Sequence, residues 1–158
     1  MPAPSQPPPG QPAELLAEVR RRRAELRHAM GVLEQAIGAP VTDRPEPWVA
    51  RVRNALLAIG ADFRLHVEVT EGPNGLYEQV LAASPRLAGP VRRLSAEHRA
   101  LTDSVAELLA WTEKPADHDA PPAIRRDATD LLALLARHRQ QGADLLYEAY
   151  ASDIGGET

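Results

Sequence analysis

The distribution of proline constrains this chain more than any other feature of its sequence. Of the fifteen prolines in 158 residues, six fall within residues 2–12, and the others leave Pro-free stretches at 13–39, 48–72, 91–114 and 123–158. A proline inside a helix costs about 3 kcal/mol, because it removes a hydrogen-bond donor and clashes with the preceding turn. Each Pro-free stretch is long enough for a helix of several turns, so the pattern predicts four helices.

The composition of these stretches favours helix over strand. They are rich in Ala, Leu, Glu and Arg and lack runs of β-branched or aromatic residues. In each stretch the apolar residues recur at the spacing of one helix face: Leu15, Val19, Leu26, Met30, Leu33 and Ile37; Trp48, Val52, Ala55, Ile59 and Phe63; Leu87, Val91, Leu94, Leu101, Val105 and Leu108; and Ile124, Leu131, Leu135 and Leu145. Four amphipathic helices with short connections predict an all-α, up-down-up-down four-helix bundle over residues 13–152.

The segments outside the long stretches have the composition of tails and breaks. Residues 1–12 are Pro-rich and carry little apolar surface, so we expect a disordered N-terminal tail. Residues 153–158 are expected to form a flexible C-terminal tail. The run Glu-Gly-Pro-Asn-Gly at residues 71–75 interrupts a helical pattern that resumes at 76–83, which predicts a kink or bulge before the third long helix.

Residue usage and charge exclude several classes of function. The chain has no cysteine, which excludes disulfides, thiolate zinc sites and iron–sulfur clusters, so any metal ligands must be His, Asp or Glu. A net charge of −4 argues against nucleic-acid binding, with the basic run Arg20–Arg23 as a local exception. No apolar stretch approaches the length of a membrane span, and the N-terminus lacks the pattern of a secretory signal, so we expect a cytoplasmic protein.

Three of the five histidines fall on the predicted inward faces of three different helices. His66, His98 and His138 each continue the apolar stripe of their helix, and residue counts from the connections put them at similar heights in an antiparallel bundle. Because an unsatisfied buried polar group costs about 1–3 kcal/mol, they need partners, either a shared metal ion or a network of nearby acids. His28 lies opposite its stripe and is expected on the surface, and Asp117–Asp119 is expected to be a solvated loop.

Short motifs around these histidines are similar to those of a known metalloprotein family. They are Glu97-His98, His66 with Glu68 and Glu71 after it, and His138 with Asp144 after it. Together with one inward histidine on each of three helices, they make residues 13–152 resemble the hemerythrin-like family. The resemblance implies a non-heme di-iron centre at the middle of the bundle and a non-enzymatic role in sensing or handling O₂, NO or redox stress.

The resemblance is incomplete at the positions of the metal ligands. The family carries His-x-x-x-Glu on its second and fourth helices, where side chains at i and i+4 share one face. This chain has Thr70 and Gly142 at the two i+4 positions, and neither supplies a carboxylate. Glu71 is one position late and would reach inward only through a helix bulge. Arg23 lies near the inward face of the first helix, where a buried guanidinium would need an acid partner.

Three hypotheses for the site remain open. The first is a mononuclear iron site that uses His66, His98 and His138, with Glu71 as a further ligand. The second is a di-iron centre recovered through irregular helix geometry, and the third is a bundle that has kept the fold without a metal. Iron would take a small diatomic ligand, as the resemblance implies.

Two further alternatives concern function more than ligands. A site of three imidazoles leaves a coordination position for water, which would suit a metal-dependent enzyme resembling the DinB-like hydrolases and transferases. The chain could instead be a metal-free interaction module that docks through charged surfaces such as Arg20–Arg23. The sequence favours a binding protein over an enzyme and does not identify a protein partner.

Overall fold

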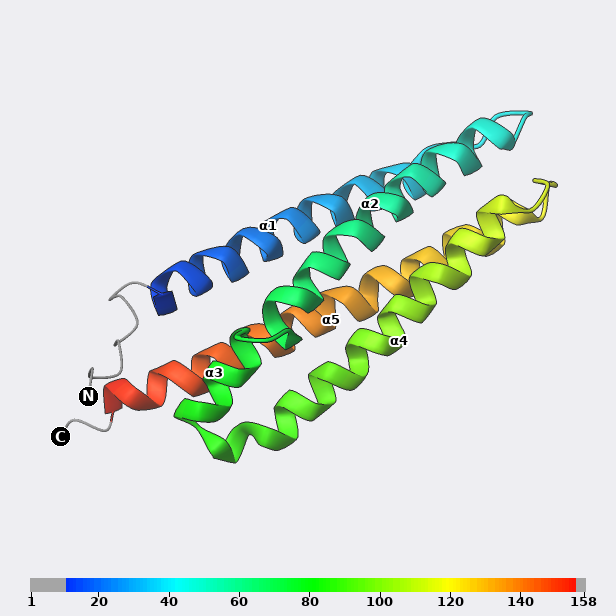
Figure 1. The fold of residues 1–158 in the computed structure, drawn as a ribbon. Coiled ribbons are helices and arrows are strands. Elements are labelled where there is room, and N and C mark those ends of the chain that lie inside the picture. The colour runs from blue at the N-terminus through cyan, green and yellow to red at the C-terminus, as the bar shows by residue number, and fades with distance from the viewer. Residues whose placement is uncertain (1–10, 156–158) are drawn as a thin grey trace.

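The computed structural model describes residues 11–155 as a bundle of helices. In chain order these are α1 (Gln11–Gly38), α2 (Glu46–Glu71), α3 (Leu76–Ala83), the 3-10 turn η1 (Pro85–Leu87), α4 (Ala88–Glu113) and α5 (Ala120–Gly155). The short α3 lies at the end of the bundle where α1 begins and α5 finishes, and the α1–α2 and α4–α5 connections lie at the opposite end (Figure 1). No strand occurs in residues 11–155, and the predicted all-α, up-down-up-down four-helix bundle is confirmed.

The helices extend slightly beyond the predicted stretches. The bundle begins at Gln11 and ends at Gly155, so most of the two predicted tails lies outside the described residues. Three long helices also start upstream of the Pro-free stretches, with Pro47, Pro90 and Pro121 within their first three positions. The first N–H groups of a helix have no acceptor within the helix, so proline there removes no hydrogen bond.

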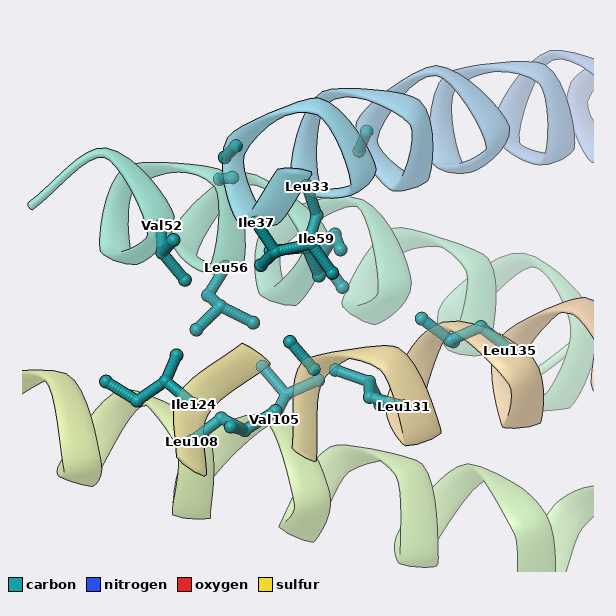
Figure 2. Packing of buried hydrophobic residues seen from close by; sticks show 14 of the residues in the cluster. Leu33, Ile37, Val52, Leu56, Ile59, Val105, Leu108, Ile124, Leu131 and Leu135 are labelled. Carbon is teal, nitrogen blue, oxygen red and sulfur yellow. The ribbon is translucent and has the colours of Figure 1, made fainter. Parts of the chain in front are cut away.

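The interior consists of two apolar clusters. In the larger one, residues from all four long helices point into a common core, including Leu33, Leu56, Val105 and Leu131 (Figure 2). The smaller cluster joins α3 to α1, α4 and α5, and contains Val19, Leu76, Tyr77, Val80, Leu87, Val91, Leu94, Leu145 and Ala149. Burying a side chain of this size contributes about 1.5–3 kcal/mol, so these two clusters hold the helices in register.

The predicted break after the second long helix is confirmed and gives α3 its place. α2 ends at Glu71, and the chain turns through residues 72–75 before α3 begins. A Cβ on Gly72 would lie 2.4 Å from the carbonyl oxygen of Glu68, and Asn74 has a φ of 59°, in the left-handed region. The turn therefore needs a residue without a side chain at Gly72, and it returns the chain so that Leu76 and Tyr77 are buried at the start of α3.

Candidate metal centre

The structure brings His66, His98 and His138 together from α2, α4 and α5. One ring nitrogen from each lies within 4.8 Å of the others, and the Nε2 atoms of His66 and His138 are 3.4 Å apart. The three residues are only 6%, 2% and 3% exposed. The predicted convergence of the three inward histidines is therefore confirmed, and they form a group with the spacing of ligands around one metal ion.

Two glutamates hold the outer nitrogens of two of these rings. Nδ1 of His98 lies 2.8 Å from Oε2 of Glu71, and Nδ1 of His138 lies 2.7 Å from Oε2 of Glu97. An imidazole that donates from Nδ1 to a carboxylate keeps the lone pair of Nε2 free, and this arrangement orients histidine ligands in metalloproteins. Glu71 was predicted as a further metal ligand. The structure places it behind His98, and α2 runs without a bulge up to Glu71 itself.

Burial favours the neutral form of the imidazoles of His66 and His98. It lowers the pKa of His66 from its ordinary 6.5 to about 3, with the neighbouring His98 and His138 as further causes. Burial also lowers the pKa of His98, although the hydrogen bond that its ring donates to Glu71 opposes this shift. Neutral rings present lone pairs to a cation at neutral pH. Nδ1 of His66 is buried and has no hydrogen-bond partner.

Two aromatic rings enclose the histidines from the two apolar clusters. The ring of Phe63 packs against all three imidazoles at centroid distances of 5.7–6.0 Å. Tyr77 stacks on His98 at 5.8 Å, and its hydroxyl lies 3.4 Å from Nε2 of that ring. Sequence reasoning missed Tyr77, for which the only signal is an aromatic residue next to the glycine-containing turn. Burial raises the pKa of Tyr77, so its hydroxyl stays protonated.

A small cavity lies where the family's motif would place carboxylates. Its volume is about 20 Å³, and its lining includes Thr70, Gly142, Tyr77, His66 and His138. Thr70 turns its hydroxyl back to the carbonyl oxygen of His66 at 2.8 Å, and a Cβ on Gly142 would meet nothing within 4 Å. The space holds one water or a molecule of similar size. The small residues at the two i+4 positions therefore leave space beside the histidines, and they supply no carboxylate ligand.

The first helix contributes no ligand to the group. Arg23 is partly buried, and its guanidinium donates to the carbonyl oxygen of Arg139 at 3.1 Å. An acid partner was expected for a buried guanidinium, whereas Arg23 is only partly buried and has a backbone carbonyl as its partner. His28 is exposed, as predicted.

The loop at residues 117–119 is exposed, as predicted, and serves the helix that follows. Oδ1 of Asp117 accepts hydrogen bonds from the backbone N–H groups of Asp119 and Ala120, at the start of α5. A carboxylate there satisfies N–H groups that have no acceptor within the helix. The carboxylate of Asp117 is therefore engaged at the start of α5.

A four-helix bundle that buries three convergent, carboxylate-supported histidines is the architecture of a cation-binding helical bundle. A family model described as the hemerythrin HHE cation binding domain matches residues 14–150, and the chain belongs to that family. No curated protein and no solved structure matches the chain. Within the described part of the chain, no helix has both the length and the apolar character needed to cross a membrane.

Proposed function

We propose that this cytoplasmic protein binds one iron ion through His66, His98 and His138 and uses it to sense or handle a small diatomic ligand such as O₂ or NO. One observation carries the proposal: three buried ring nitrogens lie within 4.8 Å of one another. When bound there, a ferrous ion would supply open coordination positions to such a ligand, since three protein donors do not complete its usual coordination.

The charges around the histidines support a divalent cation. The three imidazoles contribute no charge in their neutral form, and Glu71 and Glu97 contribute one negative charge each next to the rings they hold. The two carboxylates therefore balance a divalent ion without contacting it. Gln141, with its amide nitrogen turned toward Glu97, donates to that carboxylate at 2.7 Å and holds it in place behind His138.

The donor set fits one metal ion and does not fit two. A di-iron centre needs several carboxylates that bridge or cap the metals. The carboxylates nearest the histidines, those of Glu71 and Glu97, already accept hydrogen bonds from ring nitrogens. Thr70 and Gly142 line the space where the family's motif would place others. The described residues therefore do not support a di-iron centre.

Binding of a small molecule is better supported than the DinB-like hydrolase or transferase alternative. The cavity beside His66 and His138 measures about 20 Å³, which admits a water or a diatomic molecule but no organic substrate. A hydrolase of that kind also needs a general base aimed at the metal-bound side. The two nearby glutamates are engaged on the opposite side of the rings.

Metal analysis of protein purified without a His-tag after growth in iron tests the proposal. We expect about one iron per chain, with loss of the metal in His98→Ala and retention in the exposed control His28→Ala. Less than about 0.1 metal per chain would favour the metal-free interaction module. Two irons per chain would overturn the mononuclear site, and zinc in place of iron would favour the enzyme alternative. A change in the visible absorption of the iron-loaded protein on adding NO then tests ligand binding.

A further inference from the structure

A second concave site, outside the histidine group, lies at the surface of α1 and α5. It is a cavity of about 590 Å³ whose charged and polar lining includes Arg20, Arg23, Arg27 and His28 of α1 and Arg139 of α5. Pockets for small molecules commonly have volumes of about 300–1,000 Å³. We call this cavity the arginine groove. It shares only Arg23 and Arg139 with the small cavity beside the histidines.

The arginines of the groove are set apart from their neighbours in the same basic run. Arg21 and Arg22 form ion pairs with Glu18 at 3.0 and 2.8 Å. Arg20, Arg23 and Arg27 recur every three to four residues and therefore share one face of α1. Within residues 13–151, neither these three arginines nor Arg139 forms an ion pair. Four unpaired guanidinium groups thus line one cavity in a chain of net charge −4.

Two of these guanidinium groups are held in a partly desolvated position. Arg23 donates to the carbonyl oxygen of Arg139, and Nε of Arg139 is buried without a hydrogen-bond partner. Burial lowers the pKa of Arg23, and the nearby charge of Arg139 is the next cause. Like charges held together without an acid destabilise the empty groove, and a bound anion would remove that cost.

We propose that the arginine groove binds a small molecule carrying a phosphate or diphosphate group. Guanidinium groups present planar pairs of donors that match phosphate oxygens, and several of them around one cavity suit a ligand with more than one negative charge. Ala24 and Val32 in the same lining offer an apolar surface for an organic part of the ligand. One surface groove on an acidic chain suits a small anion better than a nucleic acid, which needs an extended basic surface.

Calorimetric titration of pyrophosphate into the full-length, chelator-treated protein at low salt tests this proposal. We expect saturable binding of one pyrophosphate per chain that weakens as sodium chloride is raised from about 50 to about 200 mM. Arg20→Gln and Arg27→Gln each weaken binding by about tenfold or more, because each removes a charge-assisted hydrogen bond. Both residues are exposed, so the fold does not depend on them.

The matched control is Arg92→Gln, which removes one charge from an exposed position on α4. This residue lies outside the groove lining, and α4 packs on α2 and α5. The affinity of Arg92→Gln for pyrophosphate should stay within about twofold of that of the parent protein, since exposed distant charges are screened. An equal loss in the control, or no binding of pyrophosphate at about 1 mM, would overturn the proposal.

Two further ligands define what the groove takes. If adenosine diphosphate binds more tightly than pyrophosphate, the organic part of the ligand adds affinity. If the two bind equally, the groove recognises the phosphate groups alone. Either result supports the proposal. A single-stranded RNA that binds while pyrophosphate does not would overturn it. Because the protein is metal-free in these titrations, their failure leaves the proposed iron site untouched.

Discussion

Replacing His66 by leucine should stabilise the metal-free protein while destroying its metal site. His66 is 6% exposed, and its Nδ1 has no hydrogen-bond partner. A buried polar group without a partner costs about 1–3 kcal/mol, and leucine is apolar and of similar size. The lost contact with Nε2 of His138 offsets part of this gain. We therefore expect His66→Leu to raise the free energy of unfolding by about 1 kcal/mol at pH 7.

The gain should grow in acid because of the pKa of His66. In the folded chain this pKa is about 3, against an ordinary value of 6.5 when the chain is unfolded. Between these values the unfolded chain binds more protons, so the free energy of unfolding falls as the pH falls. From pH 7 to pH 5 the loss from this residue alone is about 2 kcal/mol. His66→Leu removes that loss, so its advantage at pH 5 is about 3 kcal/mol.

Urea denaturation of the chelator-treated proteins, followed by circular dichroism, measures the gain in free energy of unfolding at pH 7 and at pH 5. The exposed His118 provides a matched control, and His118→Leu should track the parent protein at both values of pH. Added iron should reverse the order at pH 7, because only the parent protein gains stability from a bound metal. If His66→Leu and the parent lose the same free energy between pH 7 and pH 5, the assignment of a buried, neutral His66 is wrong.

Three further predictions concern the same structure. Glu97→Gln should weaken metal binding by about 10–100-fold in a competition titration, because it takes the charged partner from His138, and unchanged affinity would contradict that role. Leu56→Ala should lower the free energy of unfolding in urea by about 2–5 kcal/mol, since Leu56 is 0% exposed in the larger cluster, and a loss below about 1 kcal/mol would contradict tight packing there. Gly142→Ala should raise the free energy of unfolding by up to about 1 kcal/mol, because its Cβ meets nothing within 4 Å. Gly72→Ala should lower the free energy of unfolding, because its Cβ would lie 2.4 Å from a carbonyl oxygen. A Gly72→Ala variant more stable than Gly142→Ala would refute this geometry of the turn after α2.

Much of the fold and part of the site could be predicted from residue order alone. Proline excludes the helix interior by a local steric effect, so the helix limits follow from the sequence to within a few positions. The apolar stripes of the helices then determine which side chains face inward, and His66, His98 and His138 follow those stripes. Their convergence is confirmed because antiparallel helices of similar length bring similar heights together.

The partners of these histidines could not be predicted in the same way. Glu71 was predicted as a metal ligand, and the structure places it against Nδ1 of His98. Tyr77 approaches His98 only because the turn at residues 72–75 folds α3 back onto the bundle. Such contacts join side chains from different helices, and their geometry depends on the rotation and offset of each helix at the level of one residue. A helical period does not specify those quantities.

The sequence by itself determined four helices, their inward faces and the three histidines that meet at the middle of the bundle. These properties follow from interactions within one helix: the sterics of proline, helix propensity and the 3.6-residue period. The tertiary structure alone decided that two glutamates support the rings, that a small cavity remains at Thr70 and Gly142, and that four unpaired arginines share a groove. These features depend on how two or more helices pack, since burial and the distance between charges exist only once the chain has folded.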